Sequence, residues 1–259
     1  MARNELFPIR PDGLSRAFLE CSLIQECPMK SLVFRLVPGL FLFALPLLAA
    51  QDLAAPIALT TPRTHGSQVV QLQKKLLEFG FVELGEADGY FGPKSAEAVK
   101  GVQRFFGFVP NGIADPQLWK SLFSPGTAGP KVPLLISQAN AVLRGSFSLT
   151  DKELNGLSTE GGTLTEFRQG GKVRYLELRL LGETGQLQGQ VPLVPGGFVL
   201  LLTKYAYPAP FDVEHSQLSY LAYYAVGSQY LRIVDGVATE VSRDEVPALQ
   251  VILNEVRSQ

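Results

Sequence analysis

Cysteine and histidine are scarce in this chain of 259 residues, and each shortage excludes a kind of chemistry. The two histidines, His65 and His215, are far apart in the sequence, whereas zinc hydrolases commonly draw several histidines into one site. A Ser-His triad would also lack its usual G-x-S-x-G turn. The sequence therefore predicts no metal site, no cofactor and no catalytic residue.

Charge of either sign is not in excess. The chain has 23 Lys and Arg residues against 24 Asp and Glu residues, a formal net charge of -1, and no dense basic block. Because a nucleic-acid-binding protein needs a cationic surface to neutralise phosphates, no nucleic-acid partner is expected. With 46% hydrophobic and 18% charged residues, the chain is too apolar for a disordered protein and long enough to bury one or two cores.

The first fifty residues have the pattern of an export signal. Lys30 and Arg35 follow Met29, an apolar run covers residues 36–48, and two alanines at 49–50 offer a cleavage site. The run is shorter than the roughly 20 residues of a membrane-spanning helix, and proline and glycine interrupt it. A secretion signal is therefore favoured over a membrane anchor.

We interpret residues 1–50 as an N-terminal extension and signal peptide, with translation starting at Met29. A start at Met1 and an uncleaved signal are the alternatives. Cleavage would remove both cysteines, Cys21 and Cys27, so the mature chain would have neither a disulfide nor a thiol nucleophile. The expected location is the periplasm or cell envelope, or outside the cell, with no stable membrane span in the mature chain.

After a linker at residues 51–63, the sequence turns helical. Ser67 is the expected N-cap of a helix whose apolar stripe contains Val69, Leu72 and Leu76, and Gly80 suits the C′ position. A turn and a second helix should follow this first helix.

The turn-and-helix unit occurs twice. Asp88-Gly89 precedes Pro93, which suits the first position of a helix, and Asn111-Gly112 precedes Pro116 in the same way. Asp115 is placed to cap the last of these helices. Two such units behind a leading helix predict a compact three-helix domain over residues 64–124.

Three stretches carry a resemblance to a known family: "VVQLQKKLLEFGF", "DGYFGPKSAEAVKGVQRFFGF" and "NGIADPQLWKSL". They resemble the three-helix type of bacterial peptidoglycan-binding domain, whose pattern is V-x-x-L-Q-x-x-L, then D-G-x-F-G-x-x-T-x-x-A-V-x-x-F-Q, then D-G-x-x-x-P. Ser95 stands for Thr, Val102 for Phe and Asn111 for Asp, and each can fill a similar structural role. The resemblance implies peptidoglycan as the partner of residues 64–124.

The family has no single agreed set of binding residues, so the candidates come from side-chain chemistry. A phenol face suits a sugar and cations suit peptide carboxylates, which selects four ligand-binding candidates near the turns: Tyr90, Lys94, Arg104 and Asn111. Each also has a simpler, purely structural interpretation. In that interpretation Asn111 only forms the turn, and Lys94 and Arg104 are solvated surface residues.

A Pro- and Gly-rich linker at residues 125–133 leads to a second region, residues 134–259, which begins with a short helix and then alternates with period two. Leu176, Leu178 and Leu180 share one strand face. Four pairs suit two-residue hairpin turns: Gly170-Gly171, Gly196-Gly197, Gly227-Ser228 and Asp235-Gly236. The region is predicted to be an antiparallel β-meander with a C-terminal helix capped by Asp244, which makes the whole chain α+β.

The stretch "EGGTLTEFRQGGKVRYLELRLLGETGQLQ" resembles a domain of uncharacterised exported bacterial proteins, and this resemblance implies no activity. Six tyrosines follow it closely, and they either form an exposed binding face or pack as half-buried cross-strand residues. Another envelope protein is the candidate partner of such a face.

The sequence thus predicts an exported, non-catalytic cell-wall-associated protein that binds peptidoglycan and presents a β-rich interaction domain. One alternative is a wall hydrolase with its active site in residues 134–259, for which Glu177, Glu183 and Asp212 are the available carboxylates. The other is a structural protein whose helical domain no longer binds glycan.

Overall fold

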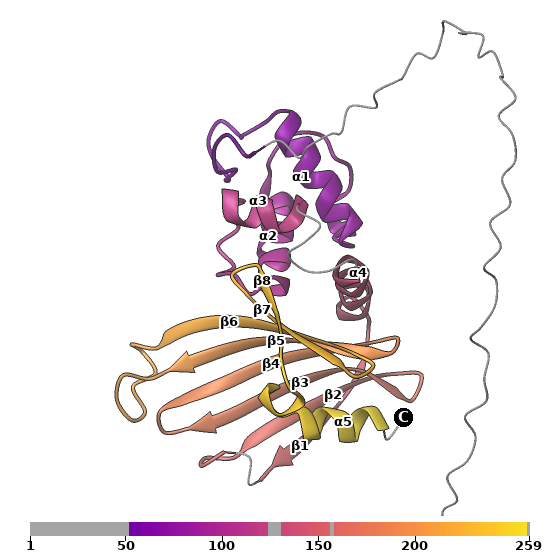
Figure 1. The fold of residues 1–259 in the computed structure, drawn as a ribbon, viewed down its shortest axis with the longest axis vertical. Coiled ribbons are helices and arrows are strands. Elements are labelled where there is room, and N and C mark those ends of the chain that lie inside the picture. Colours follow the sequence, from indigo (N-terminus) through magenta and orange to yellow (C-terminus); the bar gives the residue numbers. More distant parts are fainter. Residues whose placement is uncertain (1–51, 124–130, 156–157, 258–259) are drawn as a thin grey trace, which may run out of the picture. The chain divides into compact units, whose positions relative to one another are not determined.

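The computed structural model describes residues 52–123, 131–155 and 158–257, which belong to one compact unit, residues 48–259. The predicted signal peptide at residues 1–50 and most of the predicted linker at residues 125–133 lie outside the described residues. The chain is α+β, as the sequence predicted: helices come first, then an eight-stranded antiparallel sheet, then a last helix (Figure 1). The helices are α1 (Ser67–Glu78), α2 (Pro93–Phe105), α3 (Pro116–Phe123), α4 (Val132–Leu143) and α5 (Leu249–Arg257), with short 3-10 turns η1 (Val82–Leu84) and η2 (Arg243–Glu245).

Helix α1 ends in a Schellman motif. Gly80 has a φ of 87°, and its N–H donates to the Leu77 carbonyl at 2.9 Å, while the N–H of Phe81 donates to the Leu76 carbonyl at 3.1 Å. The same pair of bonds closes α2 around Gly107. Glycine at C′ permits this left-handed turn, so the predicted end of the first helix is confirmed.

The helix starts agree only in part with the prediction. Ser67 is the first residue of α1 and Gly66 is its N-cap, so the predicted cap at Ser67 is wrong. The reason is that the Gly66 carbonyl already accepts the Val70 N–H, which begins the helix one residue earlier. Asp115 does cap α3, because its Oδ1 accepts the Leu118 N–H at 2.7 Å.

The sheet is a meander in which each strand pairs with the next along the chain. Its strands are β1 (Ser148–Leu154), β2 (Gly162–Gln169), β3 (Lys172–Gly182), β4 (Gly185–Val194), β5 (Gly197–Ala206), β6 (Gln217–Val226), β7 (Gln229–Val234) and β8 (Val237–Glu240). Three of the four predicted hairpin turns are where the sequence placed them. The fourth is Pro195-Gly196 instead of Gly196-Gly197, because Gly197 pairs with Val194 and belongs to β5.

One face of the sheet packs against α5 (Figure 1). Leu176, Leu178 and Leu180 lie on this face, as predicted, in a core that includes Leu249 and Ile252 of the helix. We name it the α5 face.

The C-terminal helix starts later than predicted. Asp244 does not cap it: Ser242 caps η2 with a capping box to Glu245, and α5 begins at Leu249. Pro247 explains the delay, since its ring and missing N–H do not fit a helix interior.

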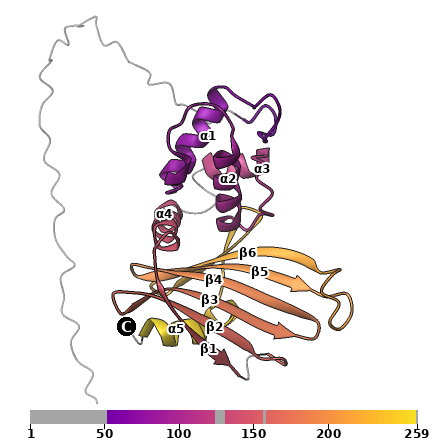
Figure 2. The same cartoon turned by 180° about the vertical axis from the view of Figure 1, so that it is seen from behind.

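The opposite face of the sheet packs in part against the helices, and we name it the helical face (Figure 2). Val199, Leu201 and Ile233 belong to the same hydrophobic core as α1 to α4. The buried hydroxyl of Tyr224 donates to the Phe105 carbonyl at 2.6 Å. The tip of the β7–β8 hairpin adds a second link, because the Gly236 N–H donates to the carbonyl of Phe106, the C-cap residue of α2, 2.8 Å away.

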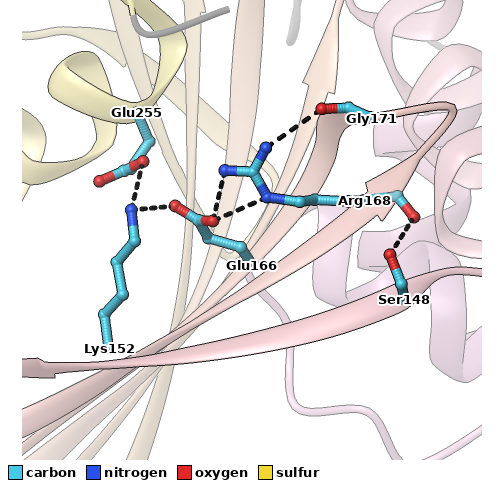
Figure 3. A network of polar contacts seen from close by, with 6 residues as sticks. All are labelled: Ser148, Lys152, Glu166, Arg168, Gly171 and Glu255. Carbon is cyan, nitrogen blue, oxygen red and sulfur yellow. Dashed lines mark hydrogen bonds and ion pairs between the residues drawn. The ribbon is translucent and has the colours of Figure 1, made fainter.

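An ionic network fixes α5 to the edge of the sheet (Figure 3). Glu166 of β2 has no exposed surface and pairs with Lys152 of β1 and with Arg168, whose Nη2 lies 2.7 Å from Glu166 Oε2. Lys152 Nζ also lies 3.0 Å from Glu255 Oε2 on α5. Burying Glu166 is tolerated because its charge is compensated by two cations.

Candidate functional site

The first candidate surface is the turn that precedes α2. The Tyr90 side chain is 54% exposed, and its ring stacks on His65 with 5.5 Å between centroids and 26° between planes. Backbone pairing between His65 and Tyr90, with the Phe91 N–H donating to the Thr64 carbonyl at 2.8 Å, holds the two rings in place. Lys94 is exposed in the first turn of α2. The surface therefore presents an oriented aromatic face near a cation.

A buried glutamine builds this turn. Gln73 of α1 donates to Asp88 Oδ1 at 2.8 Å and to the Tyr90 carbonyl at 3.1 Å, and its Oε1 accepts the Gly89 N–H at 2.8 Å. Asp88 Oδ1 also accepts the Tyr90 N–H at 2.9 Å. The hydrogen bonds from the Tyr90 backbone and from Gln73 lower the pKa of Asp88. Asp88 is thus a turn-former that positions Tyr90.

The second turn repeats the same arrangement with Gln103 of α2. Its Nε2 donates to Asn111 Oδ1 at 2.7 Å and to the Ile113 carbonyl at 2.9 Å, while its Oε1 accepts the Gly112 N–H at 2.9 Å. Asn111 Oδ1 also accepts the Ile113 N–H. The carbonyl oxygen of Asn111 is therefore engaged in the turn, although the residue is exposed. Its role as a ligand-binding residue stays a prediction.

The structure does not gather the four predicted site residues into one cluster. Tyr90 and Lys94 lie where α2 begins, whereas Arg104 lies in its last turn. At a rise of 1.5 Å per residue, Lys94 and Arg104 are about 15 Å apart along the helix axis. Arg104 is exposed and belongs to a different surface, a groove between the end of α2 and the sheet.

This groove is the second candidate surface. It has a volume of about 490 Å³, and its floor is the part of the helical face that the helices leave open. Arg104 and Pro110 form one wall, and most of the side chains on the floor are polar. We name it the sheet groove.

Hydrogen bonds order several side chains of the sheet groove. Glu177 accepts the Tyr175 hydroxyl and the Gln190 amide, the latter at 3.4 Å. Burial, together with this carboxylate, raises the pKa of Tyr175. The Tyr205 hydroxyl donates to Gln188 Oε1 at 3.4 Å. The groove therefore presents a partly pre-organised set of amides and hydroxyls.

The carboxylates that a glycosidase would need are not paired in this groove. Glu177 is the only carboxylate among the described residues that line it, whereas hydrolysis of a glycosidic bond commonly uses two. Glu183 belongs to the β3–β4 turn. Asp212 lies in the β5–β6 loop, where His215 Nδ1 is 2.8 Å from its Oδ1.

The six tyrosines do not form a fully exposed face. Tyr223 and Tyr224 are buried, and the other four are half-buried: Tyr205, Tyr207, Tyr220 and Tyr230. Burial raises the pKa of Tyr224 well above its ordinary value.

In the described part of the chain, no group of three His, Cys, Asp or Glu residues could hold a metal ion. Nor do the described residues include a helix with the length and apolarity that a membrane span requires.

Sequence reasoning missed two features of these surfaces. It did not place His65 against Tyr90, because their pairing brings together residues on either side of α1. It also missed the groove, although "GQLQGQ" places glutamine at alternate positions 186, 188 and 190 and this period of two was a usable signal.

Residues 65–122 match the model of a family described as "Putative peptidoglycan binding domain". The match spans α1 and α2 and nearly all of α3, and it supports the resemblance proposed for this region. No curated protein and no solved structure matches the chain, and the resemblance of the β-rich region to exported proteins is not confirmed. Helices α1 to α3, with their two glutamine-held turns, thus form the segment that matches this family model.

Proposed function

We propose that this is an exported, non-catalytic protein of the bacterial cell wall that binds peptidoglycan through α1 to α3 and presents its sheet for a further interaction. The family match at residues 65–122 is the observation that carries the proposal. Periplasm or cell envelope is the proposed location, and another envelope protein is a proposed partner.

The turn before α2 supplies the recognition chemistry in this proposal. The exposed Tyr90 ring, supported from behind by His65, gives a sugar an aromatic face on which to stack. Lys94 offers an ammonium group to a carboxylate of the wall peptides. Since Gln73 holds the turn through three hydrogen bonds, binding would cost little ordering of the surface.

Cosedimentation of the full chain with purified sacculi tests the proposal, and Tyr90→Ala is the informative variant. Loss of a stacked aromatic contact is worth about 1 kcal/mol, so the variant should bind roughly fivefold more weakly. Ile113→Ala is the matched control. Ile113 occupies the equivalent position in the second turn, where its N–H bonds to Asn111 Oδ1 as that of Tyr90 bonds to Asp88 Oδ1.

Three results of this experiment separate the candidate functions. Pelleting of the unmodified chain that weakens in Tyr90→Ala but not in Ile113→Ala supports binding through the first turn. Release of muropeptides from the same sacculi would instead identify a hydrolase. Failure of the unmodified chain to pellet would leave α1 to α3 as a structural support for the sheet and would contradict the proposal.

A further inference from the structure

The open part of the helical face carries two rows of side chains that run across the strands. Directly opposed residues of antiparallel strands point to the same side of a sheet, so the pairing register defines each row. The first row crosses five strands from β2 to β6: Thr163, Arg179, Gln188, Thr203 and Tyr220. All five line the sheet groove, and the row is polar throughout.

The second row lies beside the first and contains Thr165, Glu177 and Gln190 before it reaches Leu201, where the helical core begins. From β2 to β6 the rows span four strand spacings, which is about 19 Å. The groove is therefore long, with polar side chains along its length.

Two guanidinium groups give the groove positive charge. In the described parts of the chain, neither Arg104 nor Arg179 is paired with a carboxylate. Arg179 reaches only the amide oxygen of Gln186, at 3.5 Å. Glu177, the one carboxylate among the described lining residues, is occupied by Tyr175 and Gln190. The two arginines are thus available to an anionic group of a ligand.

The chemistry of these side chains indicates a class of ligand. Amides and hydroxyls both donate and accept hydrogen bonds, which suits a polymer rich in hydroxyl and acetamido groups. A guanidinium group binds a carboxylate through two parallel hydrogen bonds. An extended peptide fits less well, because peptides commonly add to a sheet edge, whereas this groove lies on a sheet face and offers few apolar side chains.

We propose that the sheet groove is a second binding site for the wall polymer, one that takes a carboxylate-bearing glycan strand between Arg104 and Arg179. Arg104 belongs to the segment that matches the peptidoglycan-binding family, so the groove continues the surface of that domain onto the sheet. The inference rests on the proposed function for the identity of the polymer. It assigns to the β-rich region a role in glycan binding that the family match does not cover.

The test is an NMR titration of the full, isotope-labelled chain with peptide-free glycan strands prepared from sacculi. Amide chemical shifts report where the strands bind, and their dependence on strand concentration gives the dissociation constant. These strands retain carboxylates on their sugars, whereas an N-acetylglucosamine oligomer serves as a neutral probe. The expected result is a shift of resonances in β3, β4 and β5, with weaker binding of the neutral oligomer. Arg179→Gln should weaken binding of the strands about tenfold, because it removes charge-assisted hydrogen bonds.

Arg174→Gln is the matched control, since Arg174 is an exposed arginine of the same strand that lies outside the sheet groove, in a separate hollow with Phe198 and Leu253. Gln188→Glu is a second variant, which keeps the side-chain size and should also weaken strand binding by repelling carboxylates. Equal binding by Arg179→Gln, Gln188→Glu and the unmodified chain would overturn the proposal.

Two further outcomes would overturn it and keep it distinct from the proposed function. One is binding of strands with no shift in β3 to β5, which would leave binding through α1 to α3 intact. The other is displacement of the strands from β3 to β5 by free stem peptide, which would make the groove a peptide site.

Discussion

Replacing Gln73 with leucine removes the side chain that holds the first turn while keeping a residue of similar size at a buried position of α1. Three hydrogen bonds to the turn are lost: two donated to Asp88 and to the Tyr90 carbonyl, and one accepted from the Gly89 N–H; the long contact to Ser95 Oγ, at 3.4 Å, goes with them and is left out of the sum. At about 1 kcal/mol each they amount to about 3 kcal/mol, and the buried Gly89 N–H loses its acceptor as well. We therefore expect the free energy of unfolding to fall by about 3 kcal/mol.

Urea unfolding of the full chain measures this change. The midpoint should fall with little change in the slope, because the surface exposed on unfolding is almost the same. Gln71→Leu is the control, since Gln71 is an exposed glutamine of the same helix. If Gln73→Leu unfolds at the same urea concentration as Gln71→Leu, the hydrogen bonds do not stabilise the turn and the reasoning is refuted. Sacculus binding should weaken in parallel, because Tyr90 loses its support.

Two further predictions concern buried polar groups. Burial acts to raise the pKa of Glu166, but hydrogen bonds, those from Lys152 and Arg168 among them, outweigh it and lower this pKa from 4.5 to about 2. The ionised carboxylate therefore contributes stability above pH 4.5 that is lost as the pH falls towards 2. Lys152→Met should move the midpoint of acid unfolding, measured by circular dichroism, to higher pH. An unchanged midpoint would contradict this. Tyr224→Phe removes the 2.6 Å hydrogen bond to the Phe105 carbonyl and should lower the free energy of unfolding by about 1 kcal/mol in urea titrations, whereas a neutral effect would show that this bond adds nothing.

Local turn chemistry made the three-helix region predictable. Asp88-Gly89, Pro93 and Gly80 each act within a few residues of their own position, and the structure uses them as turn, helix start and helix end. The cap at Ser67 failed because the Gly66 carbonyl accepts the Val70 N–H, so that α1 begins one residue earlier than the serine pattern indicates.

The sheet was predictable as a meander, because two-residue turns and alternating leucines both specify antiparallel neighbours. The contact between the sheet and the helices was not predictable from the sequence. The Tyr224 hydroxyl meets the Phe105 carbonyl across more than a hundred residues, and neither sequence neighbourhood indicates the other.

The arrangement in space of the candidate site residues was not predictable from the sequence. Tyr90 lies in the turn before α2 and Lys94 in its first turn, whereas Arg104 lies at the far end of the helix, beside the sheet groove. The groove rows consist of one residue from each strand, so they exist only once the register is known. The alternating glutamines of β4 indicated that one face of this strand is polar. They did not indicate which neighbouring strands continue the polar face.

The β7–β8 hairpin connects helices α1 to α3 to the sheet in a way that limits how the protein can be divided into separate pieces. A Cβ added at Gly107 would lie 2.4 Å from the Ile233 carbonyl oxygen, so the end of α2 and the hairpin touch at the level of their backbones. Cutting out the helices would leave the apolar side chains of Val199, Leu201 and Ile233 facing water. The separated helices and sheet would be prone to aggregate. Grafting the helices onto another protein would require a new apolar surface in place of the sheet.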